Sequence, residues 1–545
     1  MVVSFPLITC TIAALLLGGL LVALLPRGKG GNASKLQIGT TSATMIVALL
    51  CAVQALFSFD VQNGGTVQFL ERFGWIPSSG VFYAVGADGL SLSLWLLSVF
   101  VTSGVIGWTI LSTQPKAAML VSILVLTAAV IGCFVAQDLV LFFVFFELML
   151  FPSYVLLTAF GTREVEASAR PRSLFSGSPA MLFILYTALA GACMLAGIIA
   201  IGSLQVTTGE PSFGYEELAL VAPRAPLWIV SLFALAFGIK SALVPLHGWL
   251  VHTYEKAPMQ ATIIFAALLS KVGLYGLLRI CGGIFHETFA DIQGIIFILG
   301  VVGILYGALL ALAQLNLRRL LAYSSLSHLG FCFVGIGAGT IASLTGAAFQ
   351  MINHGITVAA LFMIVWALEQ RSVDLRFDAT HGLAARVPWI AGYFLIFILS
   401  SIALPLTNNF VGEFLILSGA MTQDVLLTVL ATLGVIVGAI YMLNAANKLL
   451  HGKLAEAKDG GILDLRFKEK ILLLPFVVLI FVLGVKPQAV LNLLSTSVMT
   501  FSKEGPPASD LTLEVVPTQP EESPQSDVVG TAYKAGIKFG SKGQV

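Results

Sequence analysis

Four ionisable side chains lie within stretches of sequence that are otherwise apolar. They are Glu147 in LVLFFVFFELMLFPSYVLL, Lys240 in LFALAFGIKSALVPL, Lys271 in IIFAALLSKVGLYGLL and Glu413 in FVGEFLILSGA. A charge placed inside hydrocarbon costs at least roughly 2.5 to 3.5 kcal/mol. Crossing a bilayer requires no such charge, so these positions indicate an ion or proton pathway in which each group faces a partner or water.

Proton relay is the chemistry that these residue types favour. Burial disfavours the charged form of a lysine or a carboxylate, and a nearby opposite charge restores it. If Glu147 approaches Lys240, the lysine is held charged, and separating the two makes that lysine an acid that can pass its proton onward. His328 and His354 add imidazoles, the side chains that titrate most readily near neutral pH. We expect three serines to help link these groups through a hydrated path: Ser324, Ser325 and Ser327.

Each candidate has a simpler structural alternative. The four buried charges could form ion pairs that only hold the helices together. His247, two residues after Pro245, is a further candidate for the relay, although a lone buried histidine is often a satisfied core residue.

The composition indicates a membrane protein. Of 545 residues, 57% are hydrophobic and 10% are charged, compared with about 25% charged residues in ordinary soluble domains. The net charge is +1 and no basic tract suggests a nucleic-acid partner. The six cysteines lie in apolar segments without metal-ligand spacing, so we expect no metal or redox cofactor in this chain.

The elements that must position these residues are transmembrane helices. A transmembrane helix needs about 20 apolar residues, and the sequence contains many apolar runs of about that length. Hydropathy predicts an all-α polytopic protein with about fourteen spans. They lie near 7–25, 39–58, 88–111, 118–136, 138–160, 180–203, 226–250, 260–280, 292–314, 318–339, 342–369, 388–420, 424–448 and 470–486. We expect the seventh span to break at Pro245 and the twelfth to break at Pro405, because proline frees a backbone carbonyl.

The distribution of basic residues predicts the orientation. Most Lys and Arg residues lie in the connections that follow odd-numbered spans, and the connections between spans that follow even-numbered ones carry only Arg72, Arg224 and Arg279. Since basic connections stay in the cytoplasm, we expect both termini on the non-cytoplasmic side. The tail at 503–545 is rich in proline, serine and acidic residues and is predicted to be disordered.

Two short segments of the sequence resemble each other and indicate an inverted repeat. The run Ser241–Leu246 (SALVPL) resembles Ser401–Leu406 (SIALPL), five spans later. An odd offset inverts the second copy in the membrane, which is typical of secondary transporters with broken helices.

Several motifs together resemble a known family. They are GADGLSL, FELMLFPSYVLL, GIKSALVPLHGWL, APMQATIIFAALLSKVGLYGLLR, LRRLLAYSSLSHLGF, FQMINHGITVAALF and NNFVGEFLIL. They resemble the antiporter-like subunit M, or chain 4, of the proton-pumping NADH:quinone oxidoreductase, respiratory complex I. The similarity runs from about residue 86 to about residue 452 and fixes several charged positions in order.

The resemblance implies a fourteen-helix subunit with two inverted five-helix repeats. The division it implies is N-terminal helices in 1–117, a first repeat in 118–280, a second repeat in 281–448, the last helix with its flanks in 449–502 and the tail in 503–545. In that family the positions of Glu147 and Lys240 pair, that of Lys271 links the half-channels, and those of His328, His354 and Glu413 continue the path. It implies that the chain is an enzyme subunit without a redox centre, while NADH, FMN, iron–sulfur clusters and quinone bind in partner subunits of the complex. The neighbours would be other membrane-arm subunits and lipid, in a bacterial plasma membrane or, as an alternative, an organellar inner membrane.

Two departures and three alternatives remain open. Val251-His252 stands where the family usually has proline and an acid, and Asn408-Asn409 falls in a stretch that is usually glycine-containing. The alternatives are a subunit of a multisubunit Na⁺/H⁺ antiporter, a related subunit of a membrane-bound hydrogenase, and an inert scaffold. A lysine is common at the position of Glu413 in the antiporters, so Glu413 favours complex I.

Overall fold

The computed structural model describes residues 6–161, 178–206, 211–221, 225–452 and 463–502. The elements in these ranges are α1 (Leu7–Leu24), α2 (Lys35–Ser58), β1 (Gln68–Ile76), β2 (Val81–Ala87), α3 (Gly89–Ser112), α4 (Ala117–Val135), α5 (Leu139–Leu148), α6 (Leu150–Phe160), α7 (Pro179–Val206), α8 (Tyr215–Val221), α9 (Leu227–Lys240), α10 (Gly248–Lys256), α11 (Met259–Ile264), α12 (Ser270–Gly276), α13 (His286–Leu312), α14 (Leu317–Ala338), α15 (Ile341–Glu369), α16 (Leu383–Arg386), α17 (Pro388–Ser401), α18 (Asn408–Met421), α19 (Val425–Leu450), α20 (Phe467–Val485) and α21 (Gln488–Val498). Two π-helical turns, η3 (Phe265–Leu269) and η4 (Leu277–Gly282), follow α11 and α12, and three short 3₁₀ turns are Lys29–Gly31, Pro77–Ser79 and Met499–Phe501.

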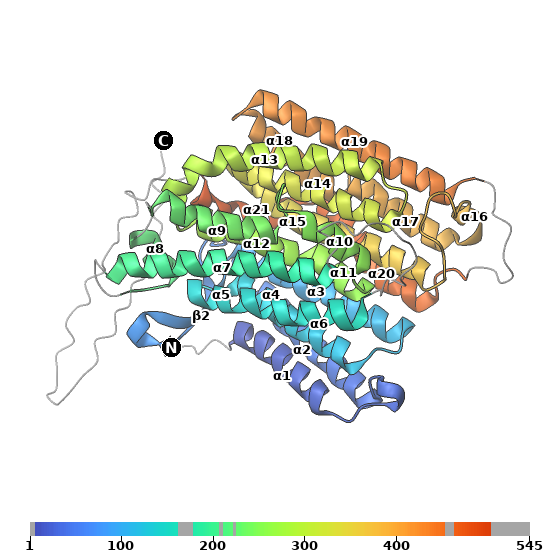
Figure 1. The fold of residues 1–545 in the computed structure, drawn as a ribbon, viewed down its shortest axis with the longest axis horizontal. Coiled ribbons are helices and arrows are strands. Elements are labelled where there is room, and N and C mark those ends of the chain that lie inside the picture. The colour runs from blue at the N-terminus through green and yellow to red at the C-terminus, as the bar shows by residue number, and fades with distance from the viewer. Residues whose placement is uncertain (1–5, 162–177, 207–210, 222–224, 453–462, 503–545) are drawn as a thin grey trace. The chain divides into compact units, whose positions relative to one another are not determined.

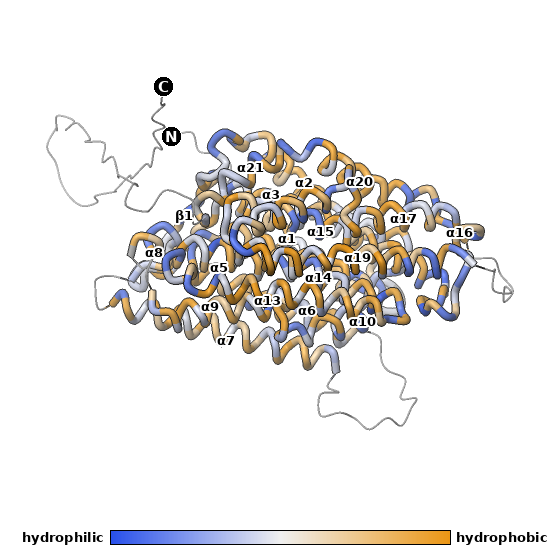
Figure 2. The backbone as a smooth tube through the Cα atoms, turned by 90° about the horizontal axis from the view of Figure 1, so that it is seen from above, coloured by the Kyte–Doolittle hydropathy of each residue, from blue (hydrophilic) through white to orange (hydrophobic). Residues whose placement is uncertain are grey.

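Long apolar helices dominate these ranges. Eleven are long and apolar enough to cross a membrane, and the count becomes twelve if α20 and α21, bent by 72°, form one span. Two shorter apolar helices, α9 and α17, lie where the broken spans are predicted. The multi-pass helical fold is therefore confirmed, while the count of fourteen spans stays a prediction. Figure 2 shows that the long helices are mostly hydrophobic and that hydrophilic residues gather near their ends.

The helices around the candidate residues form the interior of the bundle. α15 packs against α14 and α18, while α13 packs between α14 and α19 (Figure 1). The most apolar window of α15 is completely buried, as is that of the span Met259–Gly282. By contrast, only 28% of the corresponding window of α19 is buried. Charged groups on α12, α14 and α15 are therefore surrounded by protein, and a buried charge there requires a partner within the bundle.

A β-hairpin was not predicted from the sequence. β1 and β2 pair antiparallel around the turn Pro77–Ser79, which ends at Gly80 with φ of 67°. The fold is thus mostly helical but not purely α. This segment precedes the third span, and its hydrophobicity does not alternate regularly enough to distinguish a hairpin from a loop.

Both predicted breaks are present, and the two helices end alike. After α9, the amide N–H groups of Ala242 and Leu243 donate to the carbonyls of Ile239 and Gly238. After α17, those of Ala403 and Leu404 donate to Ser400 and Leu399. Each pair is the bonding pattern of a Schellman C-terminus.

A left-handed alanine completes each of these endings. Ala242 has φ of 58° and Ala403 has φ of 55°. The domain boundaries and the inverted repeats remain predictions, and the predicted disordered tail lies outside the described residues.

Candidate functional site

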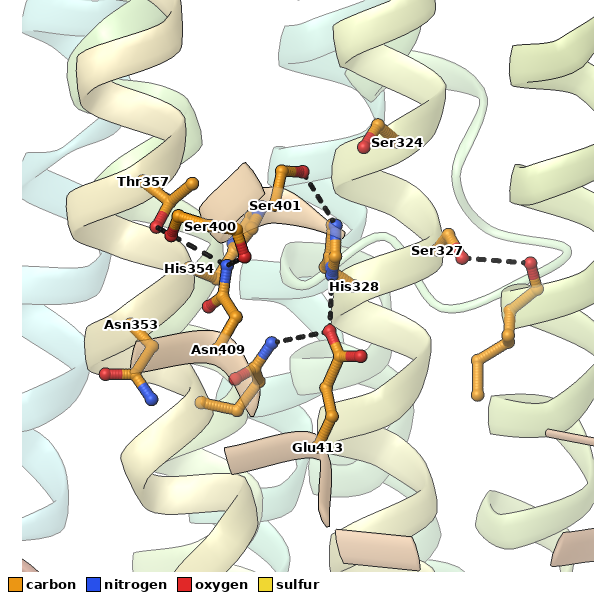
Figure 3. A network of polar contacts seen from close by, with 12 residues as sticks. Ser324, Ser327, His328, Asn353, His354, Thr357, Ser400, Ser401, Asn409 and Glu413 are labelled. Atoms are coloured by element: carbon orange, nitrogen blue, oxygen red, sulfur yellow. Dashed lines mark hydrogen bonds and ion pairs between the residues drawn. The ribbon is translucent and has the colours of Figure 1, made fainter. Parts of the chain in front are cut away.

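A carboxylate and an imidazole form the centre of the C-terminal half of the site (Figure 3). Glu413 on α18 accepts at Oε1 from Gln350 Nε2 of α15 at 3.1 Å, and the same oxygen lies 3.0 Å from His328 Nδ1 on α14. The other ring nitrogen of His328 lies 3.3 Å from Ser401 Oγ at the end of α17. Four helices therefore meet at one buried acid–base pair. Glu413 is 4% exposed and His328 is 7% exposed.

A lysine and a second imidazole form the adjoining pair. Lys271 Nζ on α12 lies 2.8 Å from His354 Nδ1 on α15 and donates to the carbonyl of Ala266 at 2.5 Å. Ala266 belongs to the π-helical turn η3, and such turns are frequent at functional sites. When the ammonium is charged it can only donate, so His354 Nδ1 must then be the unprotonated nitrogen.

The two imidazoles lie close together beside a small cavity. The ring centroids of His328 and His354 are 5.4 Å apart. Both rings line a cavity of about 10 Å³, which is about the smallest volume that can hold one water molecule. Its lining is Leu321, Ser324, Ser325, His328, His354, Thr357, Val358, Leu361, Ser401 and Asn409. One water with these polar partners would connect the two imidazoles.

Two of the three predicted serines belong to this cavity. Ser324 and Ser325 line it, although Ser324 also accepts from Tyr441 of α19 at 2.9 Å. Ser327 instead donates to the carbonyl of Ile304 on α13 at 3.0 Å (Figure 3). Ser327 therefore joins two helices and does not face the cavity.

Side chains add further hydrogen bonds at the two breaks. Trp249 on α10 donates its indole N–H to the carbonyl of Ile239 at 2.8 Å. At the second break, Asn409 Nδ2 donates to the carbonyl of Ser400 at 3.0 Å, and Ser400 Oγ donates to Asn408 Oδ1 at 2.7 Å. These two carbonyls already accept from the N–H groups of Ala242 and Ala403, so each side chain supplies a second hydrogen bond. The two asparagines that depart from the family pattern therefore join the halves of the broken helix.

The remaining pair, Glu147 and Lys240, lies in the N-terminal half. Lys240 is the last residue of α9 and is 1% exposed. Its Nζ lies 4.5 Å from the centroid of the Phe146 ring on α5. Glu147 is on α5, the helix that also carries Phe146. Within the described residues no ion pair joins Glu147 to Lys240, so the carboxylate and the ammonium are not bonded in this structure.

His247 is separate from the network described above. It precedes α10, and its ring lies 5.0 Å from that of Tyr306 on α13. Its buried Nδ1 has no hydrogen-bond partner among the described residues. A role in the relay stays a prediction.

The sequence did not identify Gln350 or Phe146 as part of the site. A glutamine one helical turn before His354 is a possible signal for Gln350, since residues four apart share a helix face. Phe146 lies in a run of phenylalanines where nothing distinguishes one ring from the next.

The arrangement provides a series of groups that can exchange protons. Lys271, His354, a water-sized cavity, His328 and Glu413 follow one another through the buried interior. Among the described residues, no cluster of three or more His, Cys, Asp or Glu side chains has the geometry to hold a metal ion.

The fold and these buried groups define a class: a multi-pass, antiporter-like membrane protein. A family model described as "NADH:quinone oxidoreductase/Mrp antiporter, TM" matches residues 136–440. The chain belongs to this family.

Three similar proteins illustrate the relationship. NADH-quinone oxidoreductase subunit M of Rickettsia prowazekii (strain Madrid E) is 32% identical over 501 residues, covering 91% of this chain and 98% of that protein. A chain in the structure titled respiratory complex I from Thermus thermophilus with bound NADH is similar with a TM-score of 0.79 and 27% identity, covering 91% and 100% of the two chains. A chain of the Mrp complex from Dietzia sp. DQ12-45-1b has a TM-score of 0.77 at 23% identity, covering 91% and 97%, which shows a shared fold.

Proposed function

We propose that this chain is a proton-translocating membrane subunit of an NADH:quinone oxidoreductase. The observation that carries the proposal is the buried series Lys271, His354, His328 and Glu413. Lys271 is hydrogen-bonded to His354, His328 is hydrogen-bonded to Glu413, and both imidazoles line one small cavity. A proton can pass along such a series as each group is protonated and deprotonated in turn, and the helix backbone does not need to move. The relatives named as subunit M support the assignment to this complex.

Each group has one role in the proposed relay. Glu147 and Lys240 accept a proton in the N-terminal half, Lys271 connects the halves, and His354, His328 and Glu413 carry the proton onward. Electron transfer takes place in partner subunits, which hold NADH, FMN, iron–sulfur clusters and quinone. The chain's own contribution is the proton path, and its neighbours are other membrane-arm subunits and lipid.

The proposal also includes a location. We place the chain in a bacterial plasma membrane with both termini on the non-cytoplasmic side, because basic residues concentrate in the connections after odd-numbered spans. The bacterial relative from Rickettsia supports the bacterial membrane.

Vesicles that contain the purified complex test the proposal. Lys240→Ala and Glu147→Ala should each sharply reduce NADH-driven proton uptake while the complex still assembles. Full proton uptake by both variants would support an inert scaffold instead. Copurification with other small membrane subunits alone, together with Na⁺-dependent proton exchange, would support a multisubunit antiporter.

A further inference from the structure

The ammonium of Lys240 rests on an aromatic ring. Its Nζ lies 4.5 Å from the centroid of Phe146, within the range in which a ring face attracts a cation. Lys240 is 1% exposed, so water cannot replace this contact efficiently. Phe146 directly precedes Glu147 on α5, so one helix carries both the ring that contacts the ammonium and the carboxylate that could pair with it.

The carboxylate of Glu147 occupies a space that a glycine leaves on the neighbouring helix. A Cβ atom added to Gly191 of α7 would lie 1.8 Å from Glu147 Oε1 and 2.8 Å from its Cδ. α7 packs against both α5 and α9, the helices that carry Glu147 and Lys240 (Figure 1). Any larger residue at 191 would therefore displace the carboxylate.

We infer that Phe146 and Gly191 are positioning residues that hold Lys240 and Glu147 apart. The ring face holds the ammonium, and the space at Gly191 holds the carboxylate. This inference rests on the proposed function, because it explains how the pair can open as well as close. Opposite charges attract strongly in an apolar interior, so without alternative partners the closed pair would dominate. A contact that stabilises the open state of the pair makes the populations of the open and closed states more nearly equal.

Phe146 also contributes to packing, so truncation alone cannot test this role. Its ring centroid lies 6.1 Å from that of Phe142 and 6.5 Å from that of Phe237. Replacement by leucine would change both the packing and the electrostatic attraction. Fluorination withdraws electron density from the ring face and nearly preserves the shape of the ring, so it separates these two effects.

The first experiment is a fluorination series at position 146 in the complete complex, reconstituted into vesicles. Phenylalanine, 4-fluoro-, 3,5-difluoro- and 3,4,5-trifluorophenylalanine are compared by the rate of NADH-driven proton uptake. The inference predicts a steady fall, by about tenfold across the series, because the attraction of the ring for the cation weakens. Equal rates throughout the series would overturn the role of the ring.

The second experiment is Gly191→Ala, with Gly392→Ala as the matched control. A Cβ at Gly392 on α17 would contact no atom within 4 Å, so the control adds a methyl group without displacing any side chain. In Gly191→Ala the flexible end of Glu147 should move toward Lys240. A structure of the variant complex should show the ion pair closed, and proton uptake should be slower than in the control. An unmoved carboxylate, or proton uptake equal to the control, would overturn the role of Gly191.

Lys240→Ala separates this inference from the proposed function. If Lys240→Ala abolishes proton uptake while the ring and glycine variants behave as wild type, the relay stands and the positioning roles fail. If Lys240→Ala pumps normally, the proposed function itself fails.

Discussion

At the scale of single residues, the buried ionisable groups of the site differ in the number of hydrogen-bonding or charged partners that hold them in place. Glu413 Oε1 is bonded by both His328 and Gln350, and Lys271 is bonded by both His354 and the Ala266 carbonyl. Lys240 has the Phe146 ring in place of a formal charge partner. The C-terminal half is therefore held by hydrogen bonds, and the N-terminal pair is the part that this structure shows open.

Glu413→Gln tests the acid of the C-terminal pair. Glutamine keeps the size of the side chain and can still accept from Gln350, but it cannot take a proton in the neutral pH range. We expect NADH-driven proton uptake to fall by about tenfold or more, because general acid–base groups contribute on the order of 10²-fold or more to proton transfer. Glu216→Gln on α8 changes an exposed carboxylate and should leave uptake unchanged. Unaltered uptake in Glu413→Gln would remove this residue from the path.

At the scale of elements, the first halves of the two broken helices end with the same backbone hydrogen bonds, but different side chains bond to the backbone at each break. Both end in the Schellman pattern. At the first break the indole of Trp249 donates a second hydrogen bond to a carbonyl, and at the second break the amide of Asn409 does so. The second break is the more polar one. It lies beside the small cavity that His328 and His354 line, because Asn409 and Ser401 also line that cavity.

Asn408→Ala tests the connection across the second break. Asn408 accepts from Ser400 Oγ at 2.7 Å and donates to the carbonyl of Asn353 at 3.2 Å. Removing it leaves both partners buried without that bond, so we expect the free energy of unfolding to fall by about 2 to 4 kcal/mol. Thermal unfolding of the purified complex measures this loss. The exposed Asn492→Ala on α21 is the control, and equal stability of the two variants would contradict the bridging role.

The sequence predicted the broken helices from Pro245 and Pro405. It predicted four of the six candidate residues from charge inside apolar runs, and the two histidines from the readiness of imidazole to titrate near neutral pH. The structure places Lys271 next to His354 and His328 next to Glu413, although these pairs are far apart in sequence. The sequence could not predict the β-hairpin, the ring contact of Lys240 or the separation of Ser327 from the other serines. Each of these depends on which side a residue faces after packing, and hydropathy alone does not determine that.

At the scale of the whole molecule, one buried ion pair joins segments that are distant in sequence. Arg279 in η4 donates to Asp88 Oδ2 at 2.8 Å and to Gln137 Oε1 at 3.3 Å, and its guanidinium lies 5.9 Å from the Phe501 ring centroid. Asp88 also caps α3 by accepting from the Ser91 N–H at 2.9 Å. The pair thus connects the start of α3, the end of α4 and the end of the described chain.

Asp88→Ala should therefore destabilise the chain more than an ordinary loss of a cap. It leaves the Arg279 guanidinium buried without its partner, which typically costs about 3 to 5 kcal/mol. Thermal unfolding of the purified complex should show a large loss for Asp88→Ala. The double variant Asp88→Ala/Arg279→Leu should recover part of it, because no buried charge is then unpaired. A double variant that is as unstable as the sum of the two single variants would contradict this account.

The orientation in the membrane can be tested with two exposed positions. Gln62 follows the second helix and Asp378 follows α15, and both are exposed. The proposed topology places Gln62 on the non-cytoplasmic side and Asp378 in the cytoplasm. A membrane-impermeant thiol reagent added to intact spheroplasts should label Gln62→Cys and not Asp378→Cys, and inverted vesicles should show the opposite. Any other pattern would contradict the proposed sidedness.

The most direct test of the buried relay is the number of protons translocated per NADH oxidised by Lys271→Met vesicles. Methionine replaces the lysine with a flexible apolar side chain that cannot titrate, while His354 and the cavity remain. The account predicts a lower proton-to-NADH ratio than in wild type, because the connection between the two halves is interrupted. A ratio equal to that of wild type would contradict it.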